Sequence, residues 1–107
     1  AVNFGTKMSM SLETLTSSGD ANDRIPLTLL NNGGATSIDL VVGTKSGQMK
    51  KFINIGAGVS TITPATFANG TTVALAQYAV AELIWTGATW VLCNQATVGT
   101  VPALTVA

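Results

Sequence analysis

The acidic side chains are the groups best suited to acid–base chemistry in this sequence, because histidine is absent. That absence removes the commonest general base, the serine–histidine pair of hydrolases and every metal site that needs imidazole. Two carboxylates flanking a sugar cleft would suit a glycosidase. The carboxylates are Glu13, Asp20, Asp23, Asp39 and Glu82. No pattern pairs two of them, so we expect no enzyme, and we expect Glu82 to form a salt bridge with Lys50 or Lys51.

Metal and glycan sites have only weak signals. Residues 20–23 have the side chains of a calcium loop, but Ile25 and Asn31 stand where an EF-hand needs glycine and glutamate. We therefore expect a turn capped by its own side chains, and no metal or cofactor. Asn69-Gly70-Thr71 fits the N-glycosylation pattern, yet Asn-Gly is also a strong hairpin signal, which is the interpretation we favour.

Aromatic side chains offer a second kind of chemistry, because their faces can stack on sugar rings. Five such residues are spread along the chain: Phe52, Phe67, Tyr78, Trp85 and Trp90. In a small β domain, scattered aromatic residues usually anchor a core or an interface. We favour that interpretation and keep sugar binding as an alternative.

The composition points to association with protein. Charged residues make up 9% of the 107 residues, against about 25% in an average soluble domain. Sixteen threonines, seven serines and seven asparagines replace them, and these residues favour strands and turns. The net charge is zero, so the chain has no field that would attract nucleic acid or an anionic membrane surface. No apolar run approaches the roughly 20 residues of a spanning helix.

A single cysteine, Cys93, cannot form a disulfide within the chain. Its neighbours Trp90, Val91 and Leu92 are apolar. We expect a buried structural thiol, because no cation close in sequence would activate it.

The elements that must position these groups are short strands separated by turns. We expect residues 1–23 to form an N-terminal arm with one edge strand, from the alternating run 9–16. Residues 24–95 should form the β module, with strands near 27–30, 38–42, 48–55, 59–63 and 71–75. Residues 96–107 should form a C-terminal extension.

Alternation in residues 48–55 predicts two different strand faces. One face carries Met49, Ile53 and Ile55 with Lys51, and the other carries Lys50, Phe52 and Asn54 among others.

Two parts of the sequence allow more than one structural interpretation. Residues 73–83 contain alanines that would suit a three-turn helix, but Gln77 interrupts the apolar stripe, so strands with a turn at Gln77-Tyr78 are favoured. Residues 29–35 and 52–58 both run from an apolar pair through asparagine to glycine and alanine. One echo does not establish a repeat, and we interpret it as recurring hairpin chemistry.

Several motifs suggest a family. Gly47-Gln48-Met49-Lys50 opens residues 47–58, glycine turns divide residues 61–72, and residues 82–92 end in a hairpin between Trp85 and Trp90. Over residues 24–93 this pattern resembles a module of tailed-bacteriophage virion proteins, found in capsid decoration (cement) proteins, head fibres and tail fibres. Thr86-Gly87 stands where that family often has aspartate before glycine.

The resemblance implies an all-β, non-enzymatic homotrimer in which short antiparallel strands and hairpins form a β-prism or β-spiral with extended termini. A thin core and little charge also favour self-burial of strand faces. The trimer core and interface candidates are Met49, Phe52, Ile53, Ile55, Phe67, Leu83, Trp85, Trp90 and Leu92.

We expect a virion protein on the capsid surface that stabilises the shell and has the major capsid protein as its partner. The candidates for capsid contact are Val2, Asn3 and Phe4. The alternative is a tail- or head-fibre module that binds host-surface carbohydrate through Trp85, Trp90 or Tyr78.

Overall fold

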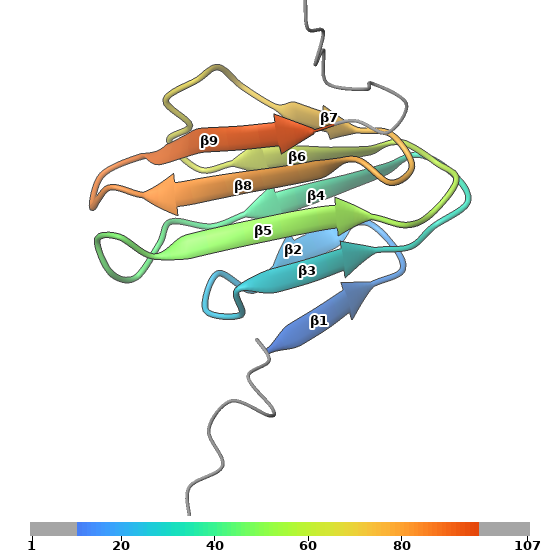
Figure 1. Ribbon diagram of the computed structural model, residues 1–107, viewed down its shortest axis with the longest axis horizontal. Coiled ribbons are helices and arrows are strands. Elements are labelled where there is room, and N and C mark those ends of the chain that lie inside the picture. Colours follow the sequence, from blue (N-terminus) through green and yellow to red (C-terminus); the bar gives the residue numbers. More distant parts are fainter. Residues whose placement is uncertain (1–10, 97–107) are drawn as a thin grey trace, which may run out of the picture.

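The computed structural model describes residues 11–96, which form two β-sheets packed face to face (Figure 1). No helix that could cross a membrane occurs among these residues. The regular secondary structure of residues 11–96 consists of strands alone, which confirms the expected all-β class. The strands of the described part are β1 (Leu12–Leu15), β2 (Gly19–Ala21), β3 (Leu27–Leu30), β4 (Thr36–Leu40), β5 (Met49–Asn54), β6 (Ser60–Pro64), β7 (Val73–Leu75), β8 (Val80–Trp85) and β9 (Trp90–Ala96).

From β1 to β6, consecutive strands belong alternately to the two sheets, and the last three strands, β7, β8 and β9, pair antiparallel with their neighbours. The five-stranded sheet has the order β1-β3-β5-β8-β9, and the four-stranded sheet has the order β2-β4-β6-β7. The pairs β1–β3, β3–β5, β2–β4 and β4–β6 are parallel. One coil of the chain therefore consists of two consecutive strands, one in each sheet. The three coils are β1/β2, β3/β4 and β5/β6, and each is stacked on the one before it. The expectation of antiparallel hairpins is wrong for these pairs and holds for β5–β8, β8–β9 and β6–β7.

Turns of successive coils lie directly on one another. Asn32 and Asn54 each accept a hydrogen bond from the amide two residues later, at Gly34 and Gly56, so both turns contain the same kind of side-chain cap. The Gly58 amide donates to the Asn32 carbonyl at 3.0 Å. A Cβ added at Gly58 would meet the Gly34 backbone, so only glycine fits there. The echo between residues 29–35 and 52–58 therefore marks two stacked coils, and its interpretation as hairpin chemistry is wrong.

The core lies between the sheets and takes alternate residues of each strand. Trp90 has no exposed surface, and its indole Nε1 donates to the Val41 carbonyl at 2.8 Å. Its ring packs against that of Trp85 at a centroid distance of 5.3 Å. The other buried apolar residues are Ala21, Leu30, Ile38, Leu40, Phe52, Ile62, Val73, Leu75, Ala79, Ala81 and Leu83.

The segment from Val73 to Leu83 forms strands and not a helix, as favoured above. Tyr78 takes a positive φ of 66° in the turn between β7 and β8, which ends any helical path. The turn between β8 and β9 is capped by Thr86, whose hydroxyl accepts from the Thr89 amide at 3.1 Å. Thr86 therefore caps this turn, at the position where the sequence resemblance described above would place aspartate.

Candidate interaction surface

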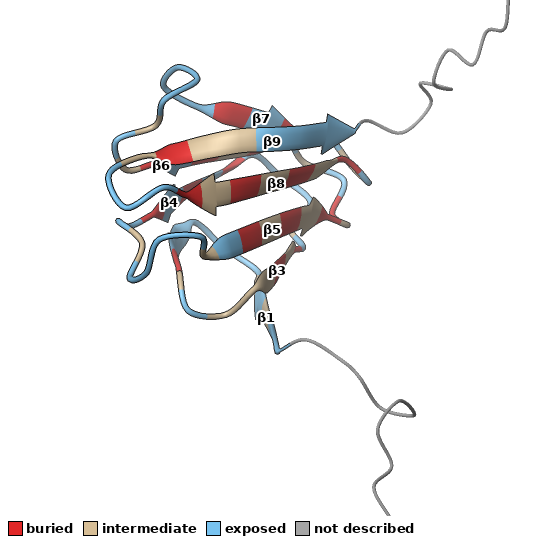
Figure 2. Cartoon of the chain, turned by 60° about the vertical axis from the view of Figure 1, so that its left-hand side comes forward, coloured by how far each residue is buried: buried red, intermediate tan, exposed pale blue. Residues whose placement is uncertain are grey.

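The outer side of the five-stranded sheet is largely apolar, whereas its inner side combines apolar residues with the buried polar residues Thr28, Lys50 and Asn54. Along β3, β5 and β8, fully buried residues alternate with partly exposed ones, so the second set faces away from the core (Figure 2). Leu12 and Met49 are the most exposed of this set, at 51% and 52%. We define the apolar outer face as the following outward-facing residues: Leu12, Leu27, Leu29, Met49, Lys51, Ile53, Val80, Glu82, Ile84 and Val91. The polar, uncharged residues Thr14 and Asn94 face the same way on the two edge strands.

The four-stranded sheet has the opposite character on its outer side. Its inward residues, such as Ile38 and Ile62, are buried, whereas its outward residues are polar. We define the polar outer face as Asp20, Ser37, Asp39, Thr61 and Thr63. The sandwich therefore has two unlike surfaces, and only the polar one is typical of a sheet in contact with water.

A single ion pair lies within the apolar outer face. Lys51 on β5 and Glu82 on β8 are register partners, and their Nζ and Oε2 atoms lie 3.5 Å apart. Asn94 on β9 donates to the other carboxylate oxygen at 3.0 Å. The hydrogen bond from Asn94, followed by the charge of Lys51, lowers the pKa of Glu82, so the carboxylate is ionised near neutral pH. The sequence-based expectation of a Glu82 salt bridge is confirmed, with Lys51 as the partner.

Another lysine explains why β5 turns its apolar side outward. Lys50 is 1% exposed, and its ammonium donates to the carbonyls of Asn22 at 2.9 Å and Ile25 at 2.6 Å and to the Thr28 hydroxyl. The Glu13 carboxylate lies 3.4 Å away. Burial lowers the pKa of Lys50, and Glu13 partly offsets this effect. Because every bonding position of the ammonium is met inside the sandwich, Ile53 and Met49 are left on the outside.

The structure divides the predicted trimer candidates into two groups. Met49, Ile53 and Ile55 lie outside the core, the first two on the apolar outer face. The others lie in the interior of one chain or pack against it, and they offer little surface to a neighbour: Phe52, Phe67, Leu83, Trp85, Trp90 and Leu92. The capsid-contact candidates Val2, Asn3 and Phe4 lie outside the described residues.

Sequence analysis missed most of the apolar outer face. Leu27 and Leu29 on β3, and Val80 and Ile84 on β8, were not among the interface candidates. Their signal was present in the sequence, because apolar residues occupy both parities of these strands, which is typical of a sheet covered on both sides.

Cys93 is exposed, so the expectation of a buried thiol is wrong. The register between β8 and β9 shifts at Glu82/Leu83, and the extra residue in β9 moves Cys93 away from the core. Its thiol donates to the Glu82 carbonyl at 3.3 Å. The apolar sequence around Cys93 gave no sign of this bulge.

The carboxylates form no metal-binding cluster within the part of the chain that the structure describes. Among residues 11–96, no group of three or more acidic, cysteine or histidine side chains could hold a metal ion. Asp20 and Asp39 are register neighbours on the polar outer face. Asp20 and Ala21 belong to β2, so the capped turn expected at residues 20–23 lies instead at residues 22–25, where the Asn22 side chain accepts from the Arg24 amide at 2.9 Å.

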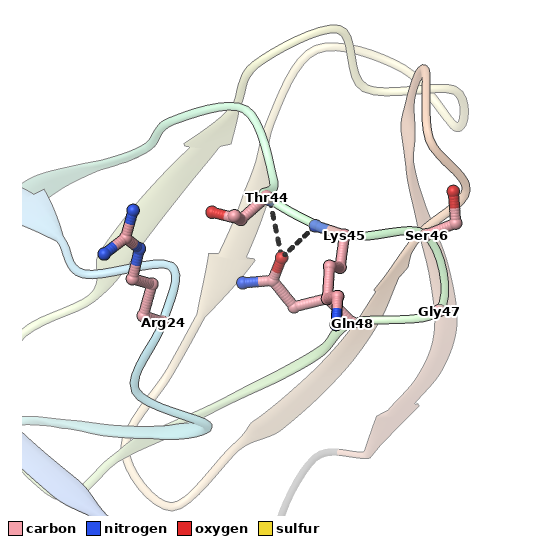
Figure 3. A pocket seen from close by; sticks show the side chains of 6 residues that line it. All are labelled: Arg24, Thr44, Lys45, Ser46, Gly47 and Gln48. Carbon is pink, nitrogen blue, oxygen red and sulfur yellow. Dashed lines mark hydrogen bonds between the residues drawn. The ribbon is translucent and has the colours of Figure 1, made fainter.

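A hollow of about 420 Å³ lies between two loops at one end of the coils (Figure 3). Gln48 holds these loops together: its carbonyl oxygen accepts from the Thr44 and Lys45 amides, and its amide donates to Asp23. Burial raises the pKa of Asp23, but hydrogen bonds from Gln48 and Thr44 outweigh it, and the net shift is downward. The polar groups of Gln48 and Asp23 are thus used in joining the loops. The remaining lining residues are Arg24, Ser46 and Gly47.

The aromatic residues proposed as sugar platforms are mostly inaccessible. Trp85 is 6% exposed and Trp90 is fully buried, so neither indole presents a face to solvent. Tyr78, at 55% exposed, is the one of the three that reaches the surface. The carbohydrate-binding alternative therefore loses two of its three proposed platforms.

In comparisons with known proteins, no protein-family model and no curated protein matches this chain.

Proposed function

We propose that this protein is a structural component of a tailed-phage virion: a homotrimeric, non-enzymatic decoration (cement) protein on the capsid surface. The observation that carries the proposal is the apolar outer face, which lies opposite a polar one. A face of this kind, apolar except for one ion pair, is often a surface that contacts another protein. The sequence resemblance described above supplies the phage context and the threefold arrangement.

The apolar outer face is about as large as the largest apolar patch on a typical monomer, about 300 to 600 Å², and such patches are often functional. Five strands about 4.8 Å apart, with about five residues each at roughly 3.4 Å per residue, span roughly 400 Å². Burying apolar surface contributes about 25 cal/mol per Å². Three copies that turn this face toward a common axis would remove it from water and leave the polar outer face exposed. This arrangement would produce a β-prism from sandwiches that are separately folded.

The proposed action is mechanical. Each trimer bridges neighbouring copies of the major capsid protein, so that contact free energy opposes expansion of the shell by packaged DNA. Val2, Asn3 and Phe4 are the proposed capsid contacts. Nucleic acid, membrane and small-molecule partners have no part in this function.

Sedimentation with capsids of the parent phage tests the proposal. The wild-type protein should co-sediment with the shells, and a variant lacking residues 1–9 should remain trimeric but bind them more weakly. Failure of the wild-type protein to bind would contradict the capsid role. Equal binding by the truncated protein would remove the N-terminal arm from the mechanism.

A further inference from the structure

The position of the Lys51–Glu82 pair is unusual for a surface ion pair. Within the strands of residues 11–96, these two residues are the only charged ones on the apolar outer face. Met49 and Ile84 form the next pair on one side, two residues away along the strands, and Ile53 and Val80 form the next pair on the other. The pair therefore lies in the middle of the surface that the proposed association would cover.

Covering this surface costs free energy unless the partner supplies polar or charged groups to the two ions. The two side chains are 35% and 25% exposed, and Glu82 receives one further hydrogen bond, from Asn94. An ammonium has three donors and a carboxylate accepts about four hydrogen bonds, so water must meet part of their capacity. A wholly apolar partner would take that water away and leave both ions poorly paired. The occupant of this face must therefore offer polar or charged groups at its centre, and opposite charges would satisfy both ions most fully.

An identical copy meets this requirement. The pair has no net charge, and its opposite charges lie on adjacent strands, so rotation about a symmetry axis can bring Lys51 of one copy beside Glu82 of the next. A cavity of about 230 Å³, lined by Pro26, Met49, Lys50, Lys51 and Glu82, leaves room beside the pair for a neighbour's side chain. We infer that Lys51 and Glu82 pair across the subunit boundary and set the register of association. This inference rests on the proposed self-association.

Charge reversal with mixing tests the inference. Lys51→Glu gives two acidic residues in every chain, and Glu82→Lys gives two basic ones. Each variant alone should associate roughly a hundredfold more weakly than the wild-type protein in sedimentation velocity, because like charges then meet across the boundary. The matched control is Asp39→Lys, on the polar outer face, which should associate like the wild-type protein.

An equimolar mixture of Lys51→Glu and Glu82→Lys separates contacts between chains from those within a chain. Within either variant chain the two residues repel each other, and only between unlike chains do opposite charges meet. In a mixed trimer, two of the three boundaries join unlike chains and one joins like chains, so the mixture should associate at least tenfold more tightly than either variant alone but more weakly than the wild-type protein. Single variants that associate like the wild-type protein, or a mixture that behaves as the sum of its parts, would overturn the pairing but leave the proposed function intact. A monomeric wild-type protein would overturn both.

Discussion

Replacing Gly58 by alanine tests the stacking of the coils. The new Cβ would overlap the carbonyl group of Gly34 in the coil below. That neighbour is backbone and cannot change rotamer, and any separation of the turns lengthens the 3.0 Å hydrogen bond from the Gly58 amide to Asn32. Overpacking and a weakened hydrogen bond together should lower the free energy of unfolding by about 2 to 4 kcal/mol.

Gly33→Ala is the matched control, because a Cβ at Gly33 has no heavy atom within 4 Å. It should be neutral or stabilising by up to about 1 kcal/mol, through loss of freedom in the unfolded chain. In urea unfolding at one protein concentration, the Gly58→Ala midpoint should fall below that of Gly33→Ala by about 1 to 3 M. Equal midpoints would refute the stacked arrangement.

Three further substitutions have defined consequences. Trp90→Ala should lower the free energy of unfolding by about 3 to 5 kcal/mol, because the indole is fully buried. Its melting temperature should lie well below that of the control Tyr78→Ala, which changes an exposed residue. Equal melting temperatures for the two variants would contradict this prediction. Lys50→Met should lower the free energy of unfolding in urea by about 3 to 5 kcal/mol, because Glu13 and two backbone carbonyls lose the ammonium that donates to them. A decrease of less than about 1 kcal/mol would contradict the buried hydrogen-bond network around Lys50. The lowered pKa of Asp23 contributes stability above pH 3.8 that is lost as the pH falls through the folded-state pKa; Gln48→Leu should reduce this acid dependence, and an unchanged pH profile of unfolding would contradict the assignment.

Local patterns in the sequence were sufficient for most strands and turns, but β2 was missed within the predicted arm and the strand expected at 38–42 lies at Thr36–Leu40. Alternation in residues 48–55 correctly grouped Met49 with Ile53 and Lys50 with Phe52. The motif Gly47-Gln48-Met49-Lys50 combines a positive φ at Gly47, the loop contacts of Gln48 and the buried ammonium of Lys50. Such residues make specific contacts, which explains why they are recognisable in the sequence.

Long-range contacts determined what the sequence could not predict. Hydrophobicity alone would place Ile53 inside and Lys50 outside, but Glu13, 37 residues before Lys50, helps to satisfy the buried ammonium. The turns at residues 31–35 and 55–59 use the residues of hairpin loops, yet each connects one sheet to the other. The residues of a turn do not show whether it joins two strands of one sheet or leads to the other sheet, so the parallel coils could not be predicted from the sequence.

The central claim is that copies of this chain associate through the apolar outer face. The most direct test is the molar mass of the wild-type protein, of Ile53→Asp in that face, and of Thr61→Asp at the matching position in the polar outer face. Light scattering at micromolar concentration should give about three times the 10.9 kDa chain mass for the wild-type protein and Thr61→Asp, and a folded monomer for Ile53→Asp. A wild-type protein that is a stable monomer, or an Ile53→Asp variant that remains trimeric, would contradict the account.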